Sequence, residues 1–289
     1  MTKSRSVLID SHPGRSAQTI GLAKELGTSP DLIHEPSVGV VGTKGDSQCY
    51  LGVSDKVDAI HARLRDRIGT EPDQLKFRLV EPQYTVATSD GIRNGTSEMR
   101  YSLIGREVTN DALCEHLEAS GLAGTIAVVA CDKPPVGTLA ALLEHNEPGI
   151  IMSDGPIHPG IDPKTGGAID IVSAYEVAGH PDPEYRHHIA CHACPGIGSC
   201  GGMFTYNTMQ TFIGVAGMQP LHMVAPASDD PKRLNEFPDE LILAATAEYL
   251  KLFIVVVPYT PPGAAGQWAI SEHPYKEARQ AQNVDETRM

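Results

Sequence analysis

Three cysteines and a histidine lie within ten residues of this sequence, in the glycine-rich stretch CHACPGIGSC at residues 191–200. They are Cys191, His192, Cys194 and Cys200. Thiolates are soft metal ligands, and glycines allow backbone N–H groups to approach sulfur atoms closely. This composition indicates a site for a soft metal ion or an iron–sulfur cluster.

Two other interpretations of this stretch stay open. Cys191 and Cys194 have the spacing of half a zinc knuckle. A zinc ribbon needs a second such pair or paired histidines, and Cys49, Cys114 and Cys131 do not supply one. Alternatively, the thiols are small apolar side chains packed in a core.

A second group of candidate ligands is the tripeptide Cys131-Asp132-Lys133, which directly follows the apolar run TIAVVA. A thiol beside a carboxylate suggests two neighbouring metal sites, one for a soft ion and one for a hard ion. An ordinary strand end is the simpler interpretation. Asp90, in the sequence TSDGI, also follows an apolar run and gains significance if it shares a hard metal with Asp132.

His187 and His188 are adjacent in the sequence. Neighbouring residues on a helix or strand point in different directions, so we expect both imidazoles to be solvated rather than to form a metal pair.

The segments around these residues alternate between strand and helix patterns. Apolar residues recur at helical spacing in residues 53–68, 99–117 and 137–145, whereas short β-branched runs predict strands at residues 37–41, 75–80, 84–87, 125–130 and 149–153. We expect Pro134 and Pro135 to form a turn before the third helix. Strand–helix alternation predicts an α/β fold with a parallel sheet flanked by helices. Ligands collect at the carboxyl ends of such strands, where Cys131 and Asp132 lie.

Composition limits the classes of partner. The 289 residues include 36 acidic and 23 basic side chains, a formal charge of −13, which argues against a nucleic-acid groove or an anionic membrane. Six cysteines are too few for a disulfide scaffold. The most apolar stretch, residues 241–257, is interrupted by Glu248 and Lys251, and the N-terminus lacks a signal-peptide core. We therefore expect a soluble cytoplasmic protein, or a mitochondrial one if the source is eukaryotic.

Three segments resemble, in order, the dihydroxy-acid and phosphogluconate dehydratase family, which includes sugar-acid dehydratases. The third is the most specific, because it combines CPGIGSCGGMFT with a following NTM. The segments are SDGIRNGTSEMRYSLIGREV (residues 89–108), ACDKPPVGTLAALLEHNEPGIIMSDGPIHPG (130–160) and HACPGIGSCGGMFTYNTMQ (192–210).

The resemblance implies a 2Fe-2S or 4Fe-4S cluster held by one cysteine from each of three segments. Cys131 matches the cysteine of the family's Cys-Asp-Lys motif, and Cys200 matches that of Ser-Cys-Gly-Gly-Met. Cys49, in GDSQCYLGV, is the candidate for the third ligand, although Tyr follows it where the family has Asn or His. No ligand role is implied for Cys194.

The resemblance also implies a Mg²⁺ ion bound by Asp90, Asp132 and a carbamylated Lys133, together with removal of water from a 2,3-dihydroxy carboxylate to give a 2-keto acid. The expected substrate is a small hydroxy acid, either a branched-chain dihydroxy acid or, alternatively, a sugar acid. The family is dimeric or tetrameric, so we expect a homo-oligomer.

Family chains are longer and carry a second, β-rich domain with a serine base, and no motif after Asp229 matches it. We therefore expect a metal-bearing α/β domain at residues 1–229. For residues 230–289 we expect a divergent tail with a helix at 241–252, a strand at 253–257 and a poorly ordered end. Catalysis would then require a complementary chain or a base that no recognised motif supplies. Otherwise, the chain would be a catalytically inactive cluster-binding protein.

Overall fold

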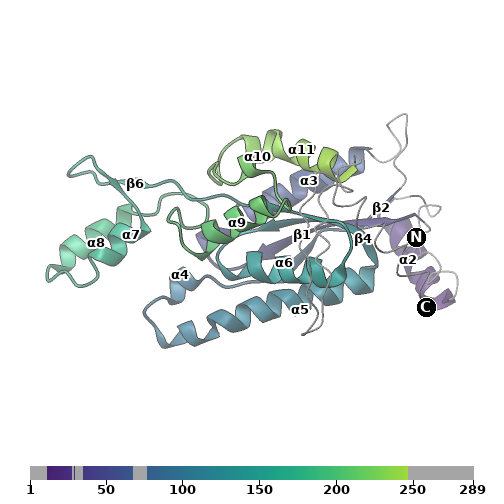
Figure 1. The fold of residues 1–289 in the computed structure, drawn as a ribbon, viewed down its shortest axis with the longest axis horizontal. Helices are drawn as coiled ribbons and strands as arrows, with labels where there is room; N and C mark the ends of the chain where they lie inside the picture. Colours follow the sequence, from purple (N-terminus) through teal and green to yellow (C-terminus); the bar gives the residue numbers. More distant parts are fainter. Residues whose placement is uncertain (1–11, 28, 30–34, 68–76, 247–289) are drawn as a thin grey trace, which may run out of the picture.

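A five-stranded parallel sheet forms the centre of the molecule, in a computed structural model that describes residues 12–27, 29, 35–67 and 77–246 (Figure 1). The strand order is β2-β1-β4-β5, and β3 pairs with β1 beyond β2 on the same edge. Every pairing in this sheet is parallel. The strands are β1 (Ser37–Lys44), β2 (Arg78–Leu79), β3 (Gln83–Val86), β4 (Leu122–Val129) and β5 (Gly149–Ser153).

Helices cover both faces of the sheet. Successive residues of a strand point to opposite faces, so Val40 joins the core on one face and Val41 the core on the other. The first face is covered by α3 (Val53–Arg67) and α11 (Phe237–Thr246), with α10 (Lys232–Asn235) beside them. The second face is covered by α5 (Ser102–Ser120), α6 (Lys133–His145) and α9 (Thr205–Val215). These observations confirm the predicted α/β fold, and Figure 1 shows α3 and α5 on opposite sides of the strands.

The strand register brings the carboxyl ends of the strands to one edge. Gly42 of β1 lies beside Val128 of β4, which in turn lies beside Met152 of β5. On the other side of β1, Lys44 pairs with Val86 at the end of β3. The segments that follow β1, β3 and β4 therefore start close together.

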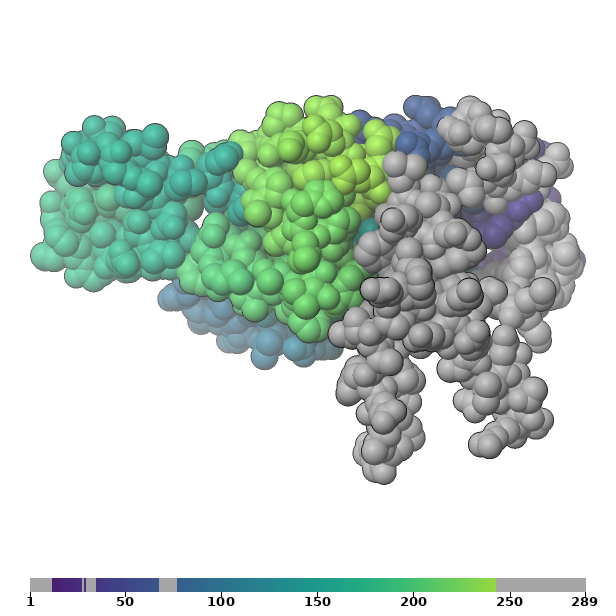
Figure 2. All heavy atoms as spheres, turned by 45° about the horizontal axis from the view of Figure 1, so that its top comes forward, coloured from purple at the N-terminus to yellow at the C-terminus, as the bar shows by residue number. Residues whose placement is uncertain are grey.

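Residues 156–199 form an arm that leaves this edge and returns to it. Its two ends pair through a bridge between Pro156 and Ser199, and Ser199 N donates to Gly155 O at 3.0 Å. The arm holds a hairpin and two helices and projects from the body as a lobe (Figures 1 and 2). Its elements are β6 (Gly160–Ile161), β7 (Ala168–Ile169), α7 (Ile171–Glu176) and α8 (Pro183–His192).

The expected turn at Pro134 and Pro135 is wrong, because α6 begins at Lys133 and both prolines lie in its first turn. Proline is tolerated there, since the N–H groups of a first helical turn have no intrahelical partner. The helix predicted over residues 99–117 is α5, preceded by a 3-10 turn, η3 (Ser97–Tyr101).

The region predicted to be a tail contributes to the core in its first part. Phe237, Leu241 and Ile242 of α11 are buried against the same face as α3. The strand predicted at 253–257, the poorly ordered end and the last part of the helix predicted at 241–252 lie outside the described residues. The division at residue 229 stays a prediction. Within the described segments, no helix is long and apolar enough to cross a membrane.

Candidate active site at the carboxyl edge of the sheet

Two buried cysteines meet at the carboxyl edge of the sheet. Cys49 lies in η2 (Gln48–Tyr50) after β1, and Cys131 follows β4; their exposed fractions are 7% and 6%. Ser89, which follows β3, bridges them: its Oγ is 3.8 Å from Cys49 Sγ and 3.7 Å from Cys131 Sγ. Three strand ends therefore supply one cluster of soft and hydroxyl groups.

The thiols influence one another's ionisation. The hydrogen bond between them lowers the pKa of Cys49 and raises that of Cys131. Burial, and then the charge of Cys131, raise the pKa of Cys200 to about 11. Cys200 is therefore near enough to Cys131 for their charges to interact. Removing a proton from any one of the three makes the next removal harder, because the negative charges of neighbouring thiolates repel one another.

Cys131 has an unusual backbone conformation. Its φ of 62° is left-handed, a region that non-glycine residues rarely adopt and that costs about 1–3 kcal/mol. The Cys131 N–H donates to Ser199 Oγ at 2.8 Å. This hydrogen bond stabilises the conformation and links Cys131 to the C-terminal end of the arm. Ser199 therefore connects the Cys131 loop to the loop that carries Cys200.

A chain of ion pairs lies beside the thiols. Lys133 Nζ donates to Asp90 Oδ2 at 2.7 Å and to Asp132 Oδ2 at 2.6 Å. Asp90, at the start of α4 (Asp90–Arg93), also accepts from Ser102 Oγ at 2.5 Å and Arg93 Nη2 at 3.0 Å. The Cys131 thiol donates to Asp132 Oδ1 at 3.2 Å, which joins the two groups.

The two carboxylates differ in acidity. Burial, Asp90 and the charge of Cys131 raise the pKa of Asp132 to about 8. Asp90 is also partly buried, but hydrogen bonds from Asp132, Lys133 and Ser102 outweigh that effect and hold its pKa at about 2. Burial lowers the pKa of Lys133, but its bonds to the two carboxyl groups outweigh this and raise it. Lys133 is therefore an ammonium ion and occupies a cation position between the acids.

The donor chemistry of this site fits one soft and one hard metal group. Three thiols provide the soft set, and two carboxyl groups with an exchangeable cation between them provide the hard set. Across the described residues, no three His, Cys, Asp or Glu side chains are already arranged to hold a metal ion. Cys49, Cys131 and the two carboxyl groups are instead paired with Ser89, with Lys133 and with one another, contacts that binding would exchange.

Residues 36–242 match the family model described as dihydroxy-acid/6-phosphogluconate dehydratase N-terminal. The chain belongs to this family. The sheet, α3, α5, α6, the arm and both groups of candidate ligands all lie within the matched residues.

The relatives in this family are named dihydroxy-acid dehydratases, which are hydro-lyases. The chain is 40% identical to the enzyme of Nitrosomonas eutropha over 228 residues, covering 76% of this chain and 39% of that protein. It is 33% identical to the enzyme of Nitrosospira multiformis, covering 74% and 38%. A mitochondrial dihydroxy-acid dehydratase of Penicillium brasilianum is 36% identical over 66% of this chain and 33% of its own length. The chain thus spans about two fifths, or less, of the length of these relatives.

The structure brings together the residues singled out by the dehydratase resemblance. Cys49, Asp90 and Cys131 come from three strand ends, Asp132 and Lys133 follow Cys131, and Cys200 interacts with it electrostatically. Their roles as metal ligands stay predictions.

The remaining cysteines have other surroundings. Cys114 lies on α5, where its thiol donates to Glu144 Oε2 at 3.4 Å, and Cys194 contacts Gln48. Cys191 is exposed and contacts His187.

Sequence reasoning missed the serines of the site. Ser89 is the N-cap of α4, where its Oγ accepts from Gly91 N at 3.2 Å. A serine before Asp-Gly is a recognisable helix start, and this was the available signal. Ser199 and Ser102 act through contacts between distant segments, which no local pattern indicates.

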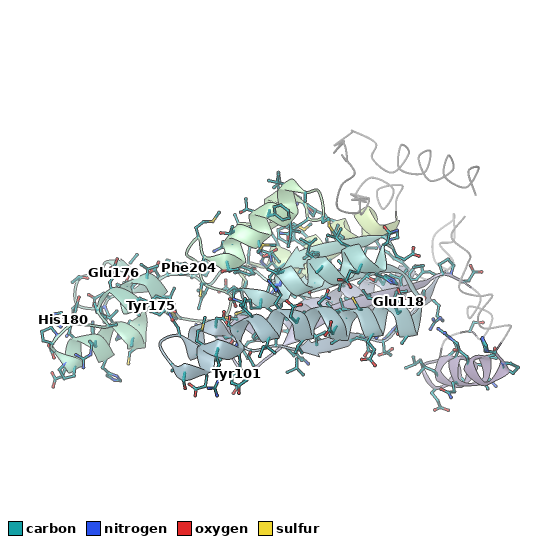
Figure 3. The ribbon with its side chains drawn as sticks, turned by 60° about the horizontal axis from the view of Figure 1, so that its bottom comes forward. Tyr101, Glu118, Tyr175, Glu176, His180 and Phe204 are labelled. Carbon is teal, nitrogen blue, oxygen red and sulfur yellow. The ribbon has the colours of Figure 1, made fainter. Side chains whose placement is uncertain are left out.

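In Figure 3, Tyr101 and Phe204 lie at the ends of α5 and α9 that face the arm, whereas Glu118 lies at the opposite end of α5.

Proposed function

We propose that this chain is the metal-bearing part of a hydro-lyase that removes water from a 2,3-dihydroxy carboxylate to give a 2-keto acid. The names of its relatives favour a branched-chain dihydroxy acid as the substrate. A sugar acid is the alternative, because the matched family also includes phosphogluconate dehydratases.

We assign an iron–sulfur cluster, either 2Fe-2S or 4Fe-4S, to Cys49, Cys131 and Cys200, and a Mg²⁺ ion to Asp90, Asp132 and a carbamylated Lys133. The observation that carries this proposal is that the adjacent side chains of Cys131 and Asp132 face different groups of donors. The Cys131 thiol faces Cys49 and Ser89, whereas Asp132 Oδ2 faces Lys133. Adjacent residues thus serve a soft and a hard donor set.

When bound, the two groups would supply Lewis acids, one for the departing hydroxyl and one for the developing enolate. Residues of this chain position the side chains that would bind these two groups. Burial of Cys49 and Cys131 keeps bulk water from the thiols. Ser102 and Arg93 orient Asp90 through hydrogen bonds to both of its carboxylate oxygens. Ser199 holds the strained Cys131 backbone.

Lys133 has to lose a proton before it can become a carbamate. Its bonds to Asp90 and Asp132 favour the ammonium form. We therefore expect carbamylation only after both carboxyl groups have been taken up by another cation, because the lysine then loses the partners that hold its proton.

The proposed activity requires a base for the C2 proton, which the family resemblance places in a second domain. Because the chain spans about two fifths of its relatives, we assign turnover to these residues together with the part of the enzyme that the relatives carry beyond the matched segment. A cluster-binding protein without catalysis is the second candidate, and it predicts no 2-keto acid even when that second domain is present.

Two substitutions test the assignment after anaerobic reconstitution of the full chain. Cys131→Ser should abolish bound iron and sulfide, whereas Asp132→Asn should keep the cluster and lose Mg²⁺. Cys114→Ser, which changes a thiol on α5, is the matched control and should retain both. If iron content were the same in Cys131→Ser as in the control, Cys131 would not be a ligand.

A further inference from the structure

A second group of metal-binding side chains lies on the arm, outside the candidate active site. Helix α8 carries His187, His188, Cys191 and His192. Residues four apart on a helix are neighbours on its surface, so His187 pairs with Cys191 and His188 pairs with His192. Figure 1 shows α8 at the outer end of the arm, away from α4 and the sheet.

The first pair has the geometry of a metal chelate. Cys191 Sγ and His187 Nε2 are 3.4 Å apart. A tetrahedral Zn²⁺ ion with a Zn–S bond of about 2.3 Å and a Zn–N bond of about 2.0 Å separates these donors by about 3.5 Å. The helix backbone therefore already holds the two donors at the separation that such an ion requires.

The imidazole rings of the second pair, His188 and His192, are held by hydrogen bonds and by contact with each other. His188 Nε2 lies 2.7 Å from Asp162 Oδ1, and the rings of His188 and His192 are 4.8 Å apart. His192 Nδ1 lies 2.7 Å from the His188 carbonyl oxygen, so it must carry the proton, which leaves Nε2 free to accept.

These side chains line an open cavity of about 510 Å³ on the arm. Glu184, one turn before His187, lines it from α8, and Lys164 lines it from the loop between β6 and β7. Cys191 is exposed, so a solvated ion can reach its thiol. The cavity leaves room for water or a small ligand to complete the coordination of an ion held by α8.

We propose that His187 and Cys191 form a two-residue chelate for a soft or borderline divalent cation such as Zn²⁺. No third His, Cys, Asp or Glu side chain in the described segments completes the set, so the other coordination positions are left to water or an exogenous ligand. Binding exchanges the thiol proton of Cys191 for the ion and releases that proton to solvent. The proposal is independent of the dehydratase assignment, because neither residue belongs to the proposed cluster or magnesium site.

Site-resolved alkylation tests the chelate in the full chain despite the five other cysteines. The rate of iodoacetamide labelling at Cys191 is measured by peptide mass spectrometry with and without Zn²⁺. Because the free thiolate is the nucleophile, Zn²⁺ should slow labelling of Cys191 by about tenfold or more. His187→Ala should remove this protection, whereas His180→Ala, a histidine on the same arm, should keep it.

Two results would overturn the proposal: no protection of Cys191 in the unmodified chain, or equal protection in the His187→Ala variant. Circular dichroism of both variants shows whether the arm helices are intact. If His187→Ala unfolds α8, the conservative His187→Gln variant replaces it, with the same loss of protection expected.

Discussion

A buried ion pair under the Cys49 loop provides a quantitative test of how the fold supports the site. Lys56 Nζ lies 2.6 Å from Asp154 Oδ1 and 3.1 Å from Ser228 Oγ, and the side chains of the pair are 2% and 0% exposed. Lys56 also donates to the Gly52 carbonyl at 3.3 Å, three residues after Cys49. The pair therefore ties α3 and the end of β5 to the loop that carries a candidate ligand.

Lys56→Met should remove the positive partner and leave the Asp154 carboxylate buried. Breaking a buried pair in this way costs about 3–5 kcal/mol of unfolding free energy. Ser228 Oγ still donates to Asp154 Oδ2 at 2.7 Å, and the positive charge of Arg233 is near. We therefore expect the lower end, about 3 kcal/mol.

The loss of unfolding free energy in Lys56→Met should increase with pH. Burial raises the pKa of Asp154, and in Lys56→Met no lysine opposes that effect. The carboxyl group then takes up a proton in the folded state more readily than in the unfolded state. The folded variant is thus favoured at low pH and loses stability as pH rises from about 4, the unfolded aspartate pKa.

Urea unfolding followed by circular dichroism at pH 5 and pH 8 measures both effects. Lys24→Met, which changes an exposed lysine on α2 (Pro13–Glu25), is the control and should be nearly neutral. The Lys56→Met/Asp154→Asn double variant should cost less than the sum of its single changes, because it removes both charges. A loss of less than about 1 kcal/mol for Lys56→Met would refute the reasoning, since that is the range of exposed pairs.

Three further predictions test the packing, a backbone constraint and the pH response. Leu241→Ala on α11 should lower the free energy of unfolding in urea by about 2–5 kcal/mol, because Leu241 is fully buried. Leu234→Ala, at a half-exposed position, should lower it much less, and equal losses would contradict the packing of α11 in the core. Gly198→Ala should lower Tm, since φ is +128° and the added Cβ would meet main-chain atoms of the arm's other end; an unchanged Tm would contradict this. Burial lowers the pKa of His61, whose Nδ1 accepts from Arg65, so stability should fall as pH drops below about 6.5, and His61→Gln should flatten that dependence in urea titrations.

The sheet could be predicted from the sequence because its strands are buried on both faces. Continuous β-branched runs at residues 37–41, 125–130 and 149–153 indicated β1, β4 and β5, and all three are confirmed. The error at Pro134 has a local cause. Proline breaks a helix when it lies in the interior but is tolerated in the first turn, and the sequence was compatible with either position.

The arm was not predicted, because long-range contacts define it. Its ends meet through the bridge between Pro156 and Ser199, and a local periodicity carries no information on which distant residue will pair. The interpretation of His187 and His188 as solvated neighbours was incomplete. His188 bonds Asp162, which is distant in the sequence, and the partner of His187 is Cys191, one helical turn later.

The candidate site was predicted in part. A parallel sheet gathers strand ends at one edge, so Cys131 and Asp90 could be expected to lie close together. Cys49 and Cys200 were identified by family resemblance. The serine bridge and the Lys133 ion pairs depend on side-chain geometry across three loops and could only be found in the structure.

Iron and acid-labile sulfide analysis of the anaerobically reconstituted full chain tests the central claim most directly. The account predicts a brown protein with iron and sulfide in near-equal amounts, and loss of both in Cys49→Ser, Cys131→Ser and Cys200→Ser but not in Cys114→Ser. A colourless protein, or one whose iron is unaffected by all three substitutions, would contradict the assignment of a cluster to this edge of the sheet.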